Sequence, residues 1–170
     1  MNVLVIVAHP DDETLGCGGT IARHILRGDN VCVLCMTDGV GARAGDPKEQ
    51  RKAFARALFI LGVKTYEWAG FDNQKLDVIP LLALNREIER VLKLVKPEVV
   101  YTHCQADLNQ DHRRVLESAL IACRALPGAS VKRLYSFSPT TGFHPTVPFA
   151  PRYFVNITPY WDIVERATTE

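Results

Sequence analysis

The sequence predicts an α/β domain, a three-layer sandwich in which a mostly parallel, Rossmann-like sheet lies between helices. Short runs rich in β-branched residues alternate along the chain with longer stretches of helical character, which is the pattern of repeated strand–helix–strand units. The first two runs, residues 3–8 and 31–36, are apolar at every position. Strands have this composition when helices cover both faces of a parallel sheet. Because such crossovers are almost always right-handed, the three layers follow.

The individual elements can be assigned from their length and punctuation. The predicted strands are residues 3–8, 31–36, 63–68, 98–102 and 133–138, with a weaker sixth run at 152–157. The predicted helices are residues 14–27, 47–61, 80–95 and 113–126, with further helical character from about Pro159. Asp46 followed by Pro47 is typical of a helix N-cap and first turn. Gly28 and Gly62 are expected to end the helices that precede them.

Composition limits the class of protein. The chain has 170 residues, 47% of them hydrophobic and 23% charged, with a net charge of +1. These values predict one globular domain over residues 1–170 and argue against disorder and against binding to nucleic acid. No stretch approaches the roughly 20 apolar residues of a membrane span, and the first apolar run is too short for a signal peptide. We therefore expect a cytoplasmic protein without a membrane partner.

Two of the five cysteines, Cys32 and Cys35, form a C-x-x-C pattern that invites a redox interpretation. They lie, however, within a predicted buried strand. Residues three apart on a strand point to opposite faces, so these thiols are expected to pack in the core rather than pair. The odd number of cysteines fits a reducing compartment.

Ligands of parallel α/β sheets bind beyond the carboxyl ends of the strands, and the first of these loops is rich in ionisable groups. His9, Asp11, Asp12 and Glu13 fall within five residues directly after a buried strand. These groups would repel and desolvate one another unless a cation lay among them. Acids before a helix also stabilise its N-terminus, which would explain Asp12 and Glu13 alone but not His9. The sequence therefore predicts a metal site.

A second polar cluster, residues 102–113, follows the fourth predicted strand and opens on the same edge of the sheet. His112 lies at the start of the next predicted helix and would be a third ligand beside His9 and Asp12. Nitrogen and carboxylate ligands suit zinc, although Fe²⁺ or another divalent metal would also bind such a set. Three protein ligands leave one position for water, which is typical of a catalytic zinc site.

Residues 8–13, Ala-His-Pro-Asp-Asp-Glu, and residues 111–113, Asp-His-Arg, resemble the two motifs of the zinc-dependent N-acetylglucosaminyl deacetylases related to PIG-L and LmbE. The resemblance extends from Asn2 to about Trp161. It implies that His9, Asp12 and His112 bind zinc and that Asp11 is the catalytic base.

The resemblance also implies substrate contacts. Arg51 is similar to the substrate-binding arginine of the family, and Asp72, followed by Asn73, is similar to the acid that contacts sugar hydroxyls. Many members have a histidine three residues before the last zinc ligand, where it assists at the oxyanion. Here that residue is Asn109, so either Asn109 or His103 is expected to supply this hydrogen bond.

The expected reaction is the removal of an N-acetyl or other N-acyl group from an N-acetylglucosamine-type sugar or its conjugate, a small-molecule substrate. Chains of the family usually continue beyond the position of Glu170, and the sequence leaves open whether a C-terminal segment is missing. A truncated relative that binds metal or sugar without catalysis is therefore the main alternative. Members of the family commonly assemble, so a homo-oligomer is also open.

Two other functions fit the sequence less well. Gly16, Gly18 and Gly19 are reminiscent of a nucleotide-binding loop, but an acidic loop separates them from the strand and would repel a pyrophosphate. Two histidines and one carboxylate also form the facial triad of non-haem iron oxygenases, whose scaffold is mostly β rather than α/β.

Overall fold

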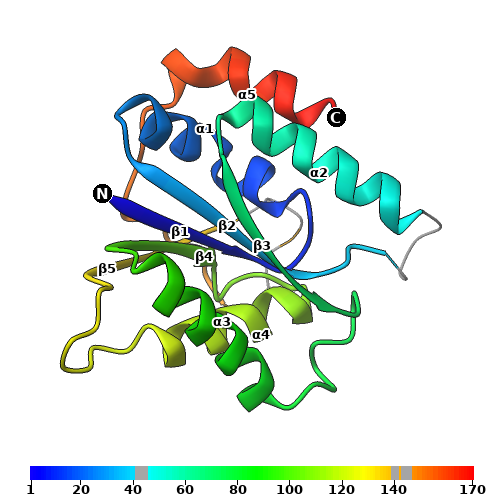
Figure 1. Ribbon diagram of the computed structural model, residues 1–170, viewed down its shortest axis with the longest axis vertical. Helices are drawn as coiled ribbons and strands as arrows, with labels where there is room; N and C mark the ends of the chain where they lie inside the picture. Colours follow the sequence, from blue (N-terminus) through cyan, green and yellow to red (C-terminus); the bar gives the residue numbers. More distant parts are fainter. Residues whose placement is uncertain (41–45, 139–141, 143–146) are drawn as a thin grey trace.

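A computed structural model of the 170-residue chain describes residues 1–40, 46–138, 142 and 147–170. The described residues form a five-stranded sheet with the order β3-β2-β1-β4-β5, and every pairing is parallel. The strands are β1 (Asn2–Val7), β2 (Asn30–Thr37), β3 (Thr65–Phe71), β4 (Val99–His103) and β5 (Arg133–Phe137). Figure 1 shows this sheet crossing the centre of the molecule.

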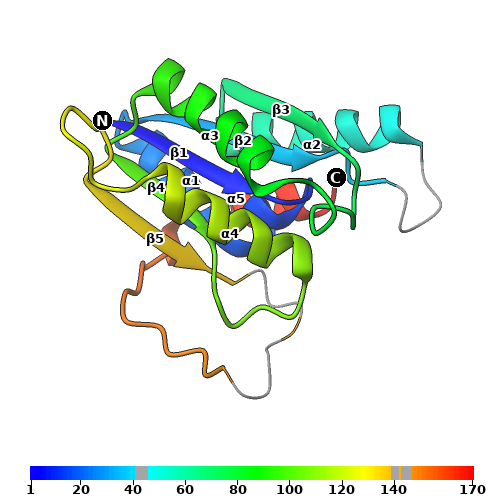
Figure 2. The same cartoon turned by 90° about the horizontal axis from the view of Figure 1, so that it is seen from below.

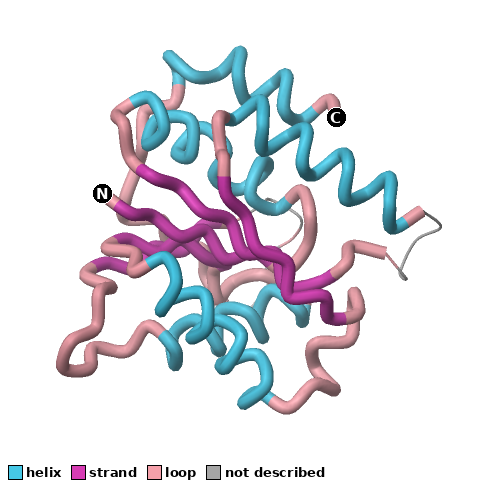
Figure 3. Tube along the Cα trace, in the orientation of Figure 1, coloured by secondary structure: helices cyan, strands magenta, loops and turns pink. Residues whose placement is uncertain are grey.

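Helices cover both faces of the sheet, which confirms the predicted three layers. One face carries α1 (Asp12–Leu26), α2 (Pro47–Leu61) and α5 (Trp161–Thr168), which contact one another. The other face carries α3 (Leu81–Val95) and α4 (Gln110–Ala122). Figure 3 shows the two groups of helices on either side of the strands. A short 3₁₀ helix, η1 (Thr158–Tyr160), leads into α5.

Two apolar clusters fill the spaces between the layers. Val3, Val5 and Val7 belong to the cluster under α1 and α2, whereas Leu4 and Ile6 belong to the one under α3 and α4. This alternation is the consequence of the two-residue period of a strand. Cys35 and Cys32 likewise fall in different clusters. The prediction that these two thiols face opposite sides of the sheet is therefore confirmed.

The residues predicted to begin α2 and to end α1 and α2 are also confirmed. The Asp46 side chain accepts a hydrogen bond from the Lys48 N–H at 2.8 Å, with Pro47 opening α2. Gly62 ends α2 with φ 84°, and Gly28 follows α1 with φ 81°. Glycine adopts this left-handed conformation without the steric cost that a side chain brings.

The weak sixth strand predicted at residues 152–157 is wrong, because this segment pairs with no strand. It lies against the sheet through side chains instead. The Tyr153 ring stacks on Tyr135 of β5, with centroids 4.8 Å apart, and Ile157 packs closely against Gly19 of α1. Apolar residues at this point fill a gap beside β5 rather than extend the sheet. Residues 41–45, 139–141 and 143–146, between the predicted elements, lie outside the described residues.

Smaller shifts occur at other boundaries. β3 begins at Thr65 rather than at residue 63, and α4 covers Gln110–Ala122 rather than 113–126. β4 extends to His103, which therefore belongs to the strand and not to the loop after it. No helix among the described residues has the length and apolar character that a membrane crossing requires.

The strand order places the carboxyl ends of β1 and β4 next to each other. β1 pairs with β2 on one side and with β4 on the other, so the direction of winding reverses between β1 and β4. The crevice at such a reversal is the usual ligand site of an open parallel sheet. Figure 2, which views the molecule from below, shows α3 and α4 in front of the strands. The two polar loops singled out in the sequence therefore meet at this edge.

Candidate functional site

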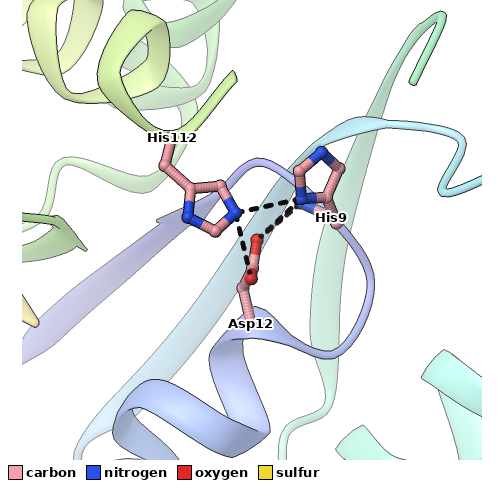
Figure 4. Close-up of side chains that lie close together, drawn as sticks. All are labelled: His9, Asp12 and His112. Atoms are coloured by element: carbon pink, nitrogen blue, oxygen red, sulfur yellow. Dashed lines mark hydrogen bonds and ion pairs between the residues drawn. The ribbon is translucent and has the colours of Figure 1, made fainter. Parts of the chain in front are cut away.

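Three side chains converge at the carboxyl edge of the sheet. His9 follows β1, Asp12 begins α1, and His112 lies in the first turn of α4. His9 Nδ1 is 3.1 Å from His112 Nε2 and 3.4 Å from Asp12 Oδ2, and His112 Nε2 is 3.3 Å from Asp12 Oδ1. Figure 4 shows the two imidazoles and the carboxylate pointing toward a common centre.

These distances fit a bound metal ion. A zinc ion with ligands at about 2.0–2.1 Å in tetrahedral geometry separates its ligand atoms by about 3.3 Å. The three separations of 3.1 to 3.4 Å at this site match that edge length. Asp12 and His112 are buried and His9 is half-buried, so their polar atoms face one another rather than water.

Each histidine also has a carboxylate on its second nitrogen. Asp107 Oδ2 lies 2.8 Å from His112 Nδ1, and Asp111 Oδ2 lies 3.1 Å from His9 Nε2. A carboxylate on the outer nitrogen fixes the tautomer and the orientation of a metal-binding imidazole. The inner nitrogens are then left facing each other and Asp12. This donor set fits a divalent cation.

The same carboxylates control protonation. Burial lowers the pKa of His9, but the hydrogen bonds that its ring donates to the Asp111 and Asp12 carboxylates outweigh burial and raise it to about 9. For His112, burial is outweighed in the same way by Asp107 and Asp12, and its pKa is also raised to about 9. Burial alone would raise the pKa of Asp12, yet the two histidines hold it below its usual range. A cation must therefore displace protons, so metal affinity is expected to rise with pH.

Asp11, the predicted base, lies between the two ligands of the first loop and is exposed. It precedes α1 with φ 144° and ψ −27°, a conformation that favours glycine. Its carbonyl accepts hydrogen bonds from the N–H groups of Thr14 and Leu15 at 3.1 and 2.9 Å. The first turn of α1 therefore holds the backbone of Asp11 in this conformation.

His103 and Asn109, the two predicted oxyanion donors, have different surroundings. His103 is completely buried, and its Nε2 accepts a hydrogen bond from the Ala8 N–H at 2.9 Å. Its ring stacks on His112 with centroids 3.9 Å apart, and burial lowers its pKa to about 3. Asn109 is half-buried and caps α4, where its Oδ1 accepts from the Asp111 N–H at 2.9 Å.

The predicted substrate residues lie on more exposed segments. The Arg51 guanidinium carbon is 5.0 Å from the centre of the Trp68 ring, and the neighbouring Glu49 pairs with Lys52 instead. Asp72 is exposed and pairs with Lys75 at 3.0 Å. Asn73 is half-buried, and its Oδ1 has no hydrogen-bond partner within the described part of the chain. Within the described residues, no hydrogen bond or ion pair joins these three side chains to His9, Asp12 or His112.

Four residues of the site had no assigned role in the sequence analysis. Asp107 and Asp111 contact the outer nitrogens of the two histidines, as described above. Gln74 donates its backbone N–H to Asp111 Oδ2 at 2.7 Å, and its side-chain Nε2 is 3.4 Å from His9 Nε2. Glu13 is completely buried in the first turn of α1. Asp107 and Asp111 lie within five residues of His112, and this spacing could have identified them as its neighbours. Nothing in the sequence distinguished Gln74.

Comparison with known proteins identifies relatives of this chain. Residues 4–123 match the profile of the PIG-L family, described as GlcNAc-PI de-N-acetylase. The uncharacterized deacetylase YaiS of Escherichia coli K12 is 33% identical over 135 residues, covering 74% of this chain and 69% of YaiS. The chain spans only 61% and 62% of the length of two further curated relatives.

Two solved structures share the fold over nearly the whole chain. The conserved protein TT1542 from Thermus thermophilus is 32% identical with a TM-score of 0.82, covering 98% of this chain and 77% of TT1542. GalB, the 4-carboxy-2-hydroxymuconate hydratase of Pseudomonas putida KT2440, is 25% identical with a TM-score of 0.72, covering 99% of this chain and 78% of GalB.

Proposed function

Because the chain belongs to the PIG-L family of GlcNAc-PI de-N-acetylases, we propose that it is a metal-dependent amide hydrolase. It removes an N-acetyl or other N-acyl group from an N-acetylglucosamine-type sugar or its conjugate. The observation that carries the proposal is the convergence of His9, Asp12 and His112 beside Asp11 at the crevice of the sheet. The sugar class is supported by the family description and by the names of relatives that act on N-acetylglucosaminyl malate.

His9, Asp12 and His112 would hold the metal, with zinc as the first candidate and Fe²⁺ or another divalent ion as alternatives. When bound, such an ion supplies a Lewis acid that polarises the acyl carbonyl and makes water a stronger acid. Asp107 and Asp111 orient the two imidazoles through the contacts of 2.8 and 3.1 Å.

Asp11 acts as the general base and then as the general acid. Its carboxylate takes a proton from water as the water oxygen forms a bond to the acyl carbon. The carbon–nitrogen bond then breaks, and Asp11 returns the proton to the leaving amine nitrogen. The products are acetate, or another carboxylate, and the free amino sugar.

A hydrogen-bond donor stabilises the oxyanion that forms on the acyl oxygen. The surroundings support Asn109 over His103 for this role. His103 is completely buried: its Nε2 accepts from the Ala8 N–H, its Nδ1 has no hydrogen-bond partner among the described residues, and its ring stacks on His112. The oxygen of the Asn109 amide accepts from the Asp111 N–H, which leaves the amide nitrogen to donate.

Arg51, Asp72 and Asn73 are proposed to bind the sugar. Two contacts support this location. Gln50, next to Arg51, donates its side-chain amide to the Pro10 carbonyl at 3.3 Å, so the start of α2 lies against the loop between β1 and α1. Gln74, next to Asn73, approaches His9. The partner in this proposal is a small amino sugar, with neither nucleic acid nor membrane. A cytoplasmic location and a homo-oligomeric state belong to the same proposal.

An acetate-release assay over a panel of N-acetylglucosamine derivatives, with and without a chelator, tests the proposal. We expect release that stops with the chelator and returns when zinc is added. If the chain holds metal but releases acetate from no derivative, the proposed enzymatic activity is contradicted. That result would favour a relative that binds metal or sugar without catalysis. A separate assay that follows consumption of 4-carboxy-2-hydroxymuconate tests the alternative, and hydration of that compound would place the chain with GalB.

A further inference from the structure

Glu13 has the most buried carboxylate of the first loop, and the mechanism above does not use it. It is completely buried in the first turn of α1. Its Oε1 accepts a hydrogen bond from the Thr14 hydroxyl at 2.8 Å, and its Oε2 accepts one from the Asp11 backbone N–H at 3.2 Å. The second contact joins Glu13 to the proposed base.

The backbone of Asp11 needs such support. With φ 144° it occupies a region that residues with a side chain rarely adopt. A conformation of this kind persists only where the surroundings over-determine it, and it is typical of active sites. The Asp11 carbonyl is held by two N–H groups of α1. The Asp11 N–H in turn donates to the carboxylate of Glu13.

The neighbouring residue is held by the same device. The His9 backbone N–H donates to Asp12 Oδ2 at 2.8 Å, just as the Asp11 N–H donates to Glu13. Two consecutive acids thus each accept from a backbone N–H of the turn that precedes them. The first contact fixes the backbone beside the proposed ligands His9 and Asp12. The second fixes the backbone of the proposed base Asp11.

We propose that Glu13 is a positioning residue, which holds the strained backbone of Asp11 so that the Asp11 carboxylate stays aligned with the metal ligands. This inference rests on the proposed function in one respect only, the role of Asp11 as base. An alternative explanation is that Glu13 merely stabilises α1, because a negative charge in the first turn interacts favourably with the helix dipole.

Two substitutions separate these explanations. Glu13→Gln removes the charge but keeps an oxygen that can accept from the Asp11 N–H, with the amide group donating to Thr14. Glu13→Asp keeps the charge but shortens the side chain by one methylene, so the carboxylate no longer reaches the Asp11 N–H. Positioning predicts that Gln is tolerated and Asp is not, whereas the dipole explanation predicts the reverse.

We expect Glu13→Asp to lower kcat by about 10- to 100-fold, because a displacement of about 1 Å can cost on the order of 10²-fold in rate. The Michaelis constant and the metal content should stay within about threefold of the parent values. Glu13→Gln should keep kcat within about threefold. Ser118→Ala is the matched control, since it removes a buried hydrogen bond of 2.7 Å to Asn85 in another helix pair. It should lower the thermal midpoint without lowering kcat.

A second measurement does not depend on catalysis. Hydrogen exchange of the Asp11 amide, followed by NMR, should be faster in Glu13→Asp than in the parent and nearly unchanged in Glu13→Gln. Equal kcat in parent and Glu13→Asp, or an equal loss in both variants, would overturn the inference. If the parent releases no acetate, the proposed function fails, and the exchange rates still test whether Glu13 holds Asp11.

Discussion

Histidine–carboxylate contacts occur at both ends of the sheet, and only one of the two groupings fits a metal. Near the amino ends of the strands, His24 Nδ1 is 2.7 Å from Asp29 and its Nε2 is 3.0 Å from the Tyr101 hydroxyl. A neutral imidazole satisfies both contacts, donating to the carboxylate and accepting from the hydroxyl. The second oxygen of Asp29 pairs with the Met1 amino group at 2.7 Å, so this grouping needs no metal.

At the carboxyl ends, the outer nitrogens of His9 and His112 are occupied by Asp111 and Asp107. The inner nitrogens are left only 3.1 Å apart, beside the buried Asp12. Two lone pairs in this arrangement repel unless protons or a metal lie between them. The presence of histidine and acid therefore does not define a metal site. What defines it is the orientation of the nitrogen atoms that remain.

The largest effect is expected from removing a ligand. His112→Ala should empty the site and lower acetate release by at least about a thousandfold, which exceeds the 10–100-fold typical of residues that only orient a ligand. Elemental analysis of the purified protein should give about one divalent metal per parent chain and almost none in the variant. A variant that keeps both metal and activity would break the comparison.

The next largest effect concerns the two adjacent acids. Asp11→Asn removes the proposed base and should lower turnover by at least about a hundredfold while the metal is retained. Asp12→Asn should weaken metal binding itself. Metal content and kcat measured on both variants decide the assignment. Loss of metal only in Asp11→Asn would show that the two roles are reversed.

Asp107→Asn tests the contact on the outer nitrogen of His112. We expect metal affinity to fall by about 10- to 100-fold, because the imidazole loses the carboxylate that fixes its orientation. Asp29→Asn makes the same change beside His24 and should leave metal affinity unchanged. Competition titrations with a zinc indicator measure both. Equal affinities in the two variants would contradict the role given to Asp107.

Arg51→Ala tests the proposed substrate contact. The loss of a hydrogen bond to a sugar hydroxyl costs on the order of 1–3 kcal/mol, so the Michaelis constant should rise about tenfold with unchanged metal content. The alternative is that Arg51 only packs on Trp68 at the surface. In that case steady-state kinetics will show no change in the Michaelis constant.

The smallest functional effect is expected at the other end of the sheet. His24→Phe removes the contact to Tyr101 and one of the two contacts of Asp29, which keeps its pairing with the Met1 amino group, and the free energy of unfolding should fall by about 1–3 kcal/mol. Acetate release and metal content should not change. Chemical denaturation together with the standard assay measures both quantities. A loss of metal in this variant would remove the contrast between the two ends of the sheet.

The sequence predicted the fold well, because apolar periodicity and helix caps are local signals. The runs at 3–8 and 31–36 correspond to β1 and β2, and α2 begins after Asp46 and ends before Gly62, as expected. The strand predicted at 152–157 is wrong, because an apolar segment packed against a sheet has the same composition as a strand within the sheet. Whether such a segment pairs depends on tertiary contacts such as Tyr153 on Tyr135.

The site was predictable to the extent that its loops directly follow strands. His9, Asp12 and His112 meet as the parallel topology requires. His103 was expected in the loop, but the strand extends by one residue and buries it. The approach of Gln74 depends on a left-handed turn with φ 57° in a long connection, and no local pattern in the sequence specifies that turn.

The carboxylate of Asp111 contacts both His9 and the connection after β3, near the residues proposed to bind the sugar. It accepts from the N–H groups of Gln74 and Leu76 at 2.7 and 3.1 Å while it contacts His9. The same carboxylate therefore fixes both the conformation of the connection after β3 and the orientation of His9, a proposed metal ligand. By thermodynamic reciprocity, any factor by which a sugar resting on that connection changes metal affinity is the factor by which metal changes sugar affinity. An affinity of this chain for either ligand is thus defined only at a stated concentration of the other.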